Sequence, residues 1–385
     1  MKPLRMQVRN LGQIAQADID FGDLTVLVGP QATGKSLLLQ SLKLGLDPRA
    51  VRATIRENGY KIGSWPEFVD FYFGEGMNSL WTDDTFVKVG STEVGPRVLN
   101  LRRIEDAVHE LVYVPAQRTL AVPTGFPRNF RDFGLDTPFV VRRYGSVLND
   151  DLLNETYVQD ADRLFPNTGR LRARIREALD ESVFHGAKLV LTEVGPRQEL
   201  RLELPDGSTL PMMAWTAGQR EFVPLLLGLY RLLPAGSISK HQDTDWIVIE
   251  EPEMGLHPQA ILAVMVLVTN LVARGYRVVL STHHPLVLDV VWTIGRIRDS
   301  GVDRPSAALC RALLGRIDPG LEQDCARILD KDLRVAALNY DKSQHVFSTD
   351  ISSLDPSDAD ETISGWGGLT GVSDQLMAAV SEVSA

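Results

Sequence analysis

Residues 29–36 read Gly-Pro-Gln-Ala-Thr-Gly-Lys-Ser and fit the pattern G-x-x-x-x-G-K-S. The run 24–28 before them is apolar and β-branched, which predicts a buried strand, and the run 37–43 after them predicts a helix. A strand, a glycine-rich turn and a helix form a phosphate-binding loop, because the turn and the helix N-terminus aim N–H groups at phosphate oxygens. The alternative is an ordinary glycine turn before a helix, and the two flanks together favour the phosphate loop.

The loop assigns a task to each of its positions. Lys35 is expected to reach the β- and γ-phosphates, and Ser36 is expected to hold Mg²⁺. The backbone of the whole loop is expected to cradle the phosphates, and its members are Gly29, Pro30, Gln31, Ala32, Thr33, Gly34, Lys35 and Ser36. The sequence therefore predicts ATP and Mg²⁺ as cofactors.

A second buried strand is predicted over residues 246–249, and it ends in Glu250 and Glu251. In a chain with a phosphate loop, such a strand is expected beside the strand that feeds the loop. Glu250 is then expected to hold the metal through water. Glu251 is expected to orient or deprotonate the attacking water, a role typically worth ~10²–10⁴ in rate. A solvated acidic turn is the alternative, and the phosphate loop makes it the weaker one.

Two further polar positions follow apolar stretches. His283 and His284 follow the predicted strand 277–280, and a histidine there can donate to the γ-phosphate. His283 is the favoured candidate because it lies closer to the strand. Gln117 follows the stretch 111–114 and can bridge Mg²⁺ and the attacking water, although a surface glutamine is the commoner explanation.

The segment 215–221 precedes an apolar helix predicted over 222–233. Thr216 is suited to cap this helix, Gly218 would let a phosphate approach its N-terminus, and Gln219 follows them. Lys35 of the same chain already cradles the γ-phosphate, so we expect the helix to serve a second copy of the protein. A plain helix cap is the alternative.

In this order the segments resemble an ABC-type ATPase, and within that class the chromosome-maintenance, RecF-like and OLD-like AAA ATPases of bacteria. The string 250–258, Glu-Glu-Pro-Glu-Met-Gly-Leu-His-Pro, resembles the form of these proteins more than that of transporters. The matching pieces are 29–36 (Walker A), Gln117 (Q-loop), 216–221 (signature), 247–251 (Walker B), 253–258 (D-loop) and 281–285 (switch histidine).

The resemblance implies that two chains close head-to-tail around two ATP molecules and that hydrolysis reopens them. The signature segment of each chain would face the γ-phosphate held by the other. Three positions depart from the family pattern: Gln31 stands for the usual asparagine, Thr216 for serine and Glu250 for aspartate. The chain has no long heptad arm. We interpret its two Asp-x-Asp pairs, 330–332 and 358–360, as solvated residues and not as a Toprim nuclease site.

The predicted fold class is α/β: a P-loop NTPase of ABC-ATPase type with an N-terminal antiparallel β-layer, a mostly parallel core sheet and helical insertions. Residues 1–300 are expected to form the ATPase domain, with insertions at about 57–100 and 119–190. The first insertion is expected to hold strands and loops, and the second to be mostly helical, with a helix over 170–182. Residues 301–385 are expected to form an α+β C-terminal extension.

Composition limits the partners. The formal charge of −10 argues against a protein covered in nucleic-acid contacts but leaves room for a local basic groove. Four arginines in the second insertion, at 170, 172, 174 and 176, are interpreted as solvated more readily than as a phosphate groove.

The longest apolar stretch, 260–273, is too short to span a bilayer. The two cysteines fit no metal spacing and are typical of a reducing, cytoplasmic setting.

The leading interpretation is an ATP-hydrolysing switch that forms a homodimer through ATP and controls an effector protein. DNA maintenance and anti-phage defence are the expected settings, the latter by analogy alone. DNA contact stays open, and no membrane contact is expected. A nucleotide-stabilised scaffold is the first alternative, and the ATPase subunit of a transporter is the second.

Overall fold

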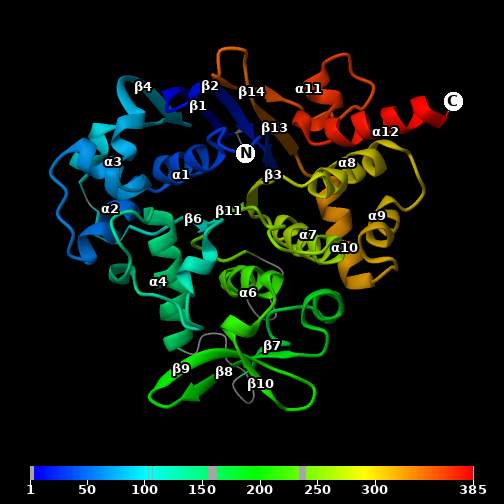
Figure 1. The fold of residues 1–385 in the computed structure, drawn as a ribbon, viewed down its shortest axis with the longest axis horizontal. Helices are drawn as coiled ribbons and strands as arrows, with labels where there is room; N and C mark the ends of the chain where they lie inside the picture. The colour runs from blue at the N-terminus through cyan, green and yellow to red at the C-terminus, as the bar shows by residue number, and fades with distance from the viewer. Residues whose placement is uncertain (1–3, 103, 106, 155–162, 234–239, 385) are drawn as a thin grey trace.

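The computed structural model describes residues 4–102, 104–105, 107–154, 163–233 and 240–384. One sheet of ten strands, in the order β5-β4-β1-β2-β14-β13-β3-β12-β11-β6, runs through the molecule (Figure 1). Its mixed pairing and flanking helices confirm the predicted α/β class. No helix among these residues is both long and apolar enough to cross a membrane.

Five neighbouring strands form the parallel part of the sheet. They are apolar at nearly every position, as strands covered on both faces must be. Their bounds are β13 (Leu333–Tyr340), β3 (Leu24–Val28), β12 (Arg277–Ser281), β11 (Trp246–Glu250) and β6 (Leu111–Val114). All residues of β3 and β11 are buried.

The expected antiparallel layer is built at the N-terminal end of the chain. Its strands alternate buried and exposed residues because one face packs on the core and the other meets solvent. Its members are β1 (Leu4–Leu11), β2 (Ile14–Phe21), β4 (Trp81–Val89) and β5 (Thr92–Val94).

The segment expected as a C-terminal extension contributes to this same sheet. β13 pairs in parallel with β3, and β14 (Val346–Asp350) pairs with both β13 and β2. Strands from the last sixty residues therefore join the antiparallel layer to the parallel strands. The boundary expected at residue 300 does not separate two sheets, because β3 would otherwise have an unpaired edge.

Helices cover the parallel strands. The central ones are α1 (Lys35–Leu46), α7 (Pro258–Ala273), α8 (Pro285–Asp299) and α6 (Ala217–Tyr230). α7 is buried along nearly its whole length. α9 (Pro305–Leu314) and α10 (Pro319–Leu329) pack beside α7 and α8, and α12 (Gly371–Ser384) forms the red arm at the C-terminus in Figure 1.

The first insertion contains helices that we did not expect. The segment 65–73 forms α3 (Trp65–Phe73), which follows α2 (Pro48–Glu57). Ser64 caps α3, and Pro66 sits in its first turn, where a missing N–H costs nothing. Phe68, Phe71 and Tyr72 recur at helical spacing and are buried in an aromatic cluster. Helical periodicity, and not β propensity, therefore decided this segment.

The second insertion contains α4 (Phe139–Leu153), which two short 3-10 turns precede, and continues into a separate four-stranded antiparallel sheet. The helix expected over 170–182 is limited to α5 (Ala173–Leu179), which a π-helical turn over Asp180–Phe184 follows. The strands, at the bottom of Figure 1, are β7 (Arg163–Phe165), β8 (Lys188–Val194), β9 (Arg197–Glu203) and β10 (Thr209–Pro211).

The arginines of this insertion make contacts within the chain. Arg172 donates to Asp324 at 2.7 Å and to the Gly320 carbonyl at 2.6 Å. Arg174 donates to the Leu314 carbonyl at 3.2 Å. These contacts dock α5 onto α9 and α10. The two guanidinium groups therefore have a structural task that the sequence did not reveal.

A buried ion pair fastens the edge strand β6 to α1. Lys43 contacts Asp47 and donates to the Leu111 carbonyl at 2.5 Å. Asp47 accepts from the N–H groups of Glu110 at 2.9 Å and Leu111 at 3.1 Å. Burial raises the pKa of Asp47, but Lys43 and His109 outweigh it and set the pKa at about 2.

We predict that Asp47→Ala lowers the free energy of unfolding by about 3–5 kcal/mol, because it leaves the Lys43 ammonium buried without its partner. Urea denaturation at neutral pH measures the change. Since the pKa of Asp47 lies below its ordinary 3.8, the stabilisation is present above about pH 4 and is lost as pH falls toward 2. Asp299→Ala, at an exposed pair on α8, should leave the midpoint unchanged. An equal effect of both variants would contradict the assignment.

Candidate functional site

The ends of three parallel strands meet at one edge of the sheet. The register pairs Leu27 of β3 with Ser281 of β12, and Ser281 with Glu250 of β11. The loops that follow these strands therefore start side by side. In open α/β sheets, ligands bind at this carboxyl edge.

The loop after β3 has the tight geometry that its glycines permit. Gly29 has a φ of 138°, and a Cβ at this position would lie 2.1 Å from the Leu338 carbonyl oxygen of β13. Gly34 has a φ of 87°, and a Cβ there would lie 2.8 Å from Ile14. Neither position has room for a side chain. β13 and the start of β2 thus both help to shape the loop.

Lys35 is buried inside this loop. Its Nζ atom donates to the carbonyls of Gly29 and Pro30, both at 2.8 Å. Burial lowers the pKa of Lys35 to about 8, and the carboxylates of Glu251, Glu253 and Glu250 oppose the decrease. An ammonium that is held among carbonyl oxygens and faces three carboxylates is well placed to exchange these contacts for a phosphate.

A cavity of about 340 Å³ opens over the loop. Glu251, Ser281 and His283 line it together with loop residues 31–36. Five lining residues lie outside the motifs identified in the sequence: Gln13, Leu37, Gln40, Met77 and Leu80. Gln13 lies in the turn between β1 and β2 and donates to the Ala32 carbonyl at 2.5 Å. Its place in a turn of the predicted antiparallel layer is the one feature of the sequence that could have indicated it.

Glu250 fits a divalent cation. Its carboxylate is buried, and Oε2 accepts from the Ala116 N–H at 3.1 Å. Within the described residues, Oε1 is buried with no hydrogen-bond donor in contact. Burial raises the pKa of Glu250, and the neighbouring Ser36 and Tyr113 hydroxyls and the Ala116 N–H oppose this increase. An under-satisfied carboxylate beside a serine hydroxyl is a set of hard oxygen donors that suits Mg²⁺.

Glu251 turns away from the strand and into the cavity. Its φ is 44°, a left-handed value that is uncommon for a residue with a side chain and costs roughly 1–3 kcal/mol. Its N–H donates to the Ser281 carbonyl at 2.9 Å. Its Oε1 lies 3.6 Å from Nε2 of His283. Strain of this kind clusters at functional sites, so the backbone marks Glu251 independently of the motif.

The two histidines have different surroundings. His283 lines the cavity, and burial together with the charge of Lys35 lowers its pKa. His284 caps α8 by accepting from the Leu286 N–H at 3.1 Å. Glu253 fixes the start of the loop that follows β12. Its Oε1 accepts from the Thr282 hydroxyl at 2.7 Å and from the His283 N–H at 2.8 Å.

The structure places Gln117 after β6, with its side chain exposed and outside the residues that line the cavity. Its neighbour Ala116 contacts Glu250. Bridging of Mg²⁺ and water by Gln117 therefore stays a prediction that requires the side chain to turn inward.

The signature segment begins α6 on an exposed surface. Thr216 and Gln219 cap the helix reciprocally, each donating its N–H to the other's side chain at 3.2 Å. Gly218 packs against the Gly255 turn of the same chain, and a Cβ there would lie 2.7 Å from the Gly255 oxygen. None of residues 216–219 lines the cavity over Lys35. The helix cap considered from the sequence is present, and the exposed N-terminus remains free to meet another molecule.

Arg118 is a residue whose importance the sequence did not reveal. Its side chain is fully buried and donates to three main-chain carbonyls: Glu221 at 2.9 Å, Glu250 at 2.9 Å and Glu251 at 3.0 Å. Its Nε also lies 3.6 Å from a Glu221 carboxylate oxygen. One guanidinium thus joins the first turns of α6 to the strained backbone of Glu251. Only its position directly after a predicted strand and Gln117 could have drawn attention to it.

The two Asp-x-Asp pairs of the C-terminal region have structural tasks. Asp332 contacts Arg334, and Asp360 caps the short helix α11 (Glu361–Ser364). Within the described parts of the chain, no group of three or more His, Cys, Asp and Glu side chains is arranged to hold a metal ion.

The α/β fold and the phosphate loop agree with the predicted class, a P-loop NTPase of ABC-ATPase type. The model of the family described as "AAA domain, putative AbiEii toxin, Type IV TA system" matches residues 99–289. This match confirms the resemblance to the ABC-type AAA ATPases that the motifs indicated. Proteins of such a family bind a nucleotide and usually Mg²⁺. No sequence among curated proteins matches the chain.

Two solved structures are similar to the chain at low sequence identity. An SmcHead bound to the C-winged helix domain of ScpA is 9% identical, with a TM-score of 0.43, and the alignment covers 91% of this chain and 97% of that one. An SMC head domain from Thermotoga maritima is 13% identical, with a TM-score of 0.34, and the coverage is 75% and 92%. At these scores neither structure bears on the function of this chain.

We predict that Arg118→Met slows ATP hydrolysis more than it weakens ATP binding, because three carbonyls lose charged donors and the Glu251 backbone loses a support. A hydrogen bond to a charged group contributes about 1.5–3 kcal/mol, so unfolding should also become easier by at least that amount. Turnover, nucleotide affinity and urea denaturation measure the three effects. Glu221→Gln removes only the longer ionic contact and should have a smaller effect. Equal loss of binding and turnover in Arg118→Met would contradict this positioning role.

Proposed function

We propose that the protein binds ATP with Mg²⁺, hydrolyses it, and pairs head-to-tail with a second copy while ATP is bound. The observation that supports this best is the cavity in which Lys35, Glu251 and His283 converge from three strand ends. These are the groups that phosphoryl transfer to water requires: a cation for the phosphates, a base and a polar sensor.

Each group has a distinct part in the proposed reaction. Lys35 and the loop N–H groups hold the triphosphate. Glu251 orients the attacking water and accepts its proton, and neutral His283 donates a hydrogen bond to the terminal phosphate. Ser36 and Glu250 would hold Mg²⁺, which neutralises charge on the phosphate oxygens when bound.

A second copy is proposed because the exposed N-terminus of α6 lies outside the cavity of its own chain. Helix N-termini favour anions, and the one that begins at Ala217 faces solvent. Closing two chains around ATP would give it the terminal phosphate of the partner. ATP would then favour the closed pair by the difference in its affinity for the two states.

Arg118 links the helix proposed to contact the second copy, α6, to the residue proposed to activate water, Glu251. It contacts the α6 residue Glu221 and the backbone of Glu251 at once. Docking of α6 onto a partner's phosphate would therefore change the position of Glu251, the residue proposed to activate water. A pairing-dependent ATPase of this kind serves as a switch for an effector protein.

The setting we propose is anti-phage defence or DNA maintenance. The description of the matching family names a toxin of a toxin–antitoxin system, which supports a defence role for this chain. The internal contacts of Arg172 and Arg174 make those two residues poor candidates for contact with DNA. An effector protein is therefore the proposed partner ahead of nucleic acid.

We predict that Glu251→Gln binds ATP but hydrolyses it about 10²–10⁴-fold more slowly and accumulates as a dimer. Turnover and light scattering with ATP measure this. Lys35→Ala is the matched control, since it should lose nucleotide affinity and stay monomeric. Wild-type turnover in Glu251→Gln would overturn the catalytic assignment. A wild-type protein that retains ATP without ever cleaving it would instead favour the nucleotide-stabilised scaffold.

We predict that Ala217→Glu binds ATP normally yet fails to pair. Ala217 is exposed in the first turn of α6, where an acidic side chain favours the helix by roughly 0.3–1 kcal/mol, so the monomer should fold. The same charge would repel a partner's terminal phosphate. Ala217→Gln has the same size without the charge and should still pair. We prefer this position to Gly218, because any side chain at Gly218 would displace the Gly255 turn. Sedimentation with ATP decides, and pairing by both variants would overturn the head-to-tail arrangement.

A further inference from the structure

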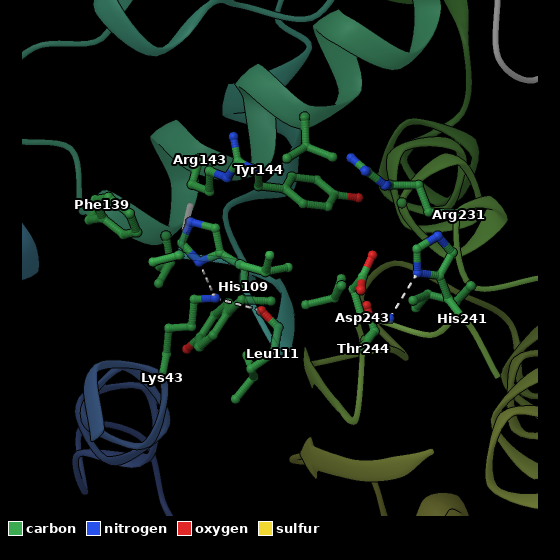
Figure 2. A pocket seen from close by; sticks show the side chains of 18 residues that line it. Lys43, His109, Leu111, Phe139, Arg143, Tyr144, Arg231, His241, Asp243 and Thr244 are labelled. Atoms are coloured by element: carbon green, nitrogen blue, oxygen red, sulfur yellow. Dashed lines mark hydrogen bonds between the residues drawn. The ribbon is translucent and has the colours of Figure 1, made fainter. Parts of the chain in front are cut away.

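A second cavity, of about 310 Å³, lies between α4, β6, α1 and the end of α6 (Figure 2). It shares no lining residue with the cavity over the phosphate loop. Ligand sites of this size accept small organic molecules.

Much of the lining is apolar. Phe139, Val140 and Tyr144 of α4 stand along one side, and Leu111 and Val112 of β6 stand along another. The Tyr144 hydroxyl already donates to the Pro224 carbonyl, so its ring presents only an apolar face. This part of the cavity suits an aromatic or alkyl body.

Two guanidinium groups give the cavity its charge. Arg143 of α4 and Arg231, directly after α6, both line it. In the described part of the chain, no carboxylate lies within 4.0 Å of Arg143 as an ion-pair partner, and Arg231 has only a loose contact with Asp151 at 3.7 Å. Burial lowers the pKa of Arg143 and the positive charge of Arg231 adds to the decrease, while the more distant carboxylates of Asp150, Glu57 and Asp151 oppose it. Arg143 is partly buried and Arg231 is exposed at the mouth of the cavity, and guanidinium groups bind anions through charge-assisted hydrogen bonds.

The other titratable groups of the cavity do not supply that anion. Lys43 is already paired with Asp47. Burial and the charge of Lys43 lower the pKa of His109 to about 3, so this imidazole is neutral. Asp243 is exposed and could accept a hydrogen bond from a hydroxyl or amino group of a ligand.

We propose that this cavity binds a small anionic molecule with an apolar or aromatic body, its anionic group held by Arg143 and Arg231. Arg143 is presented by α4 of the second insertion, to which the sequence had assigned no chemistry. The site gives this insertion a task.

The cavity is also lined by residues of α1, β6 and α6, the elements that the proposed ATPase mechanism uses. The coupling inferred from this rests on the proposed function. Lys43 belongs to the helix that starts at the phosphate loop, and Tyr113 belongs to β6, after which the Ala116 N–H donates to Glu250 at 3.1 Å. Gly228 and Arg231 lie at the end of the helix that begins at the signature segment. A ligand that favours one arrangement of these elements must change ATP affinity, and ATP must change its affinity by the same factor.

Phenyl phosphate is a suitable probe, because it joins an aromatic ring to an anion. Calorimetry on the full chain should show binding to the wild-type protein, weakened about tenfold or more in Arg143→Gln and in Arg231→Gln. Arg298→Gln, an exposed position on α8, is the matched control and should bind as the wild type does. Benzyl alcohol, which lacks the anion, should bind more weakly than phenyl phosphate.

Lys35→Ala separates this cavity from the phosphate loop. Binding that persists in Lys35→Ala and weakens in Arg143→Gln and Arg231→Gln supports the proposal. Absence of binding, or binding that depends on Lys35 and not on the two arginines, overturns it. Unchanged ATP affinity at saturating phenyl phosphate overturns the coupling alone. A wild-type protein that binds no ATP overturns the proposed ATPase function but leaves the phenyl phosphate result to be judged by itself.

Discussion

The register of the parallel strands is the constraint on which the rest of the molecule depends. Because β3, β12 and β11 are paired in step, their carboxyl ends form one line, and the loops after them meet. Lys35 shares one cavity with Glu251 and His283, although both lie more than two hundred positions further along the chain. A slip of one residue in β11 would turn the Glu250 side chain to the opposite face of the sheet. Backbone hydrogen bonding thus sets the geometry, and the side chains supply the charges.

Buried charge is handled the same way at several places, by surrounding it with main-chain groups. Lys35 is held by two carbonyls, and Arg118 by three. Asp47 accepts two backbone N–H groups. Hydrogen bonds of this kind offset part of the desolvation cost of a buried ion, and at Asp47 they add to the ion pair with Lys43. They also tie segments together, so that each buried ion fixes the position of an adjoining loop or strand.

The second insertion links the two cavities of the protein. It contributes α4, which presents Arg143 and Tyr144, and it precedes α6, which starts at the exposed signature segment. Arg118 stands just before the insertion and holds α6 to the backbone of Glu251. A change in the packing of α4 and α6 would therefore reach the nucleotide cavity over a short path of direct contacts.

The sequence by itself determined the local elements of this protein. Apolar runs predicted strands β3, β11 and β12, and the glycines and Lys35 predicted the loop, because strand burial and tight turns leave strong local patterns. The helix α3 was mistaken for strands and loops, because its many aromatic residues hid a helical period. Tertiary structure alone decided that β13 pairs beside β3, that Gly29 must lie against Leu338, that Arg118 is buried among main-chain carbonyls, and that Arg143 lines the second cavity. These facts depend on contacts between distant segments, and no local pattern of residue types records which segments will touch.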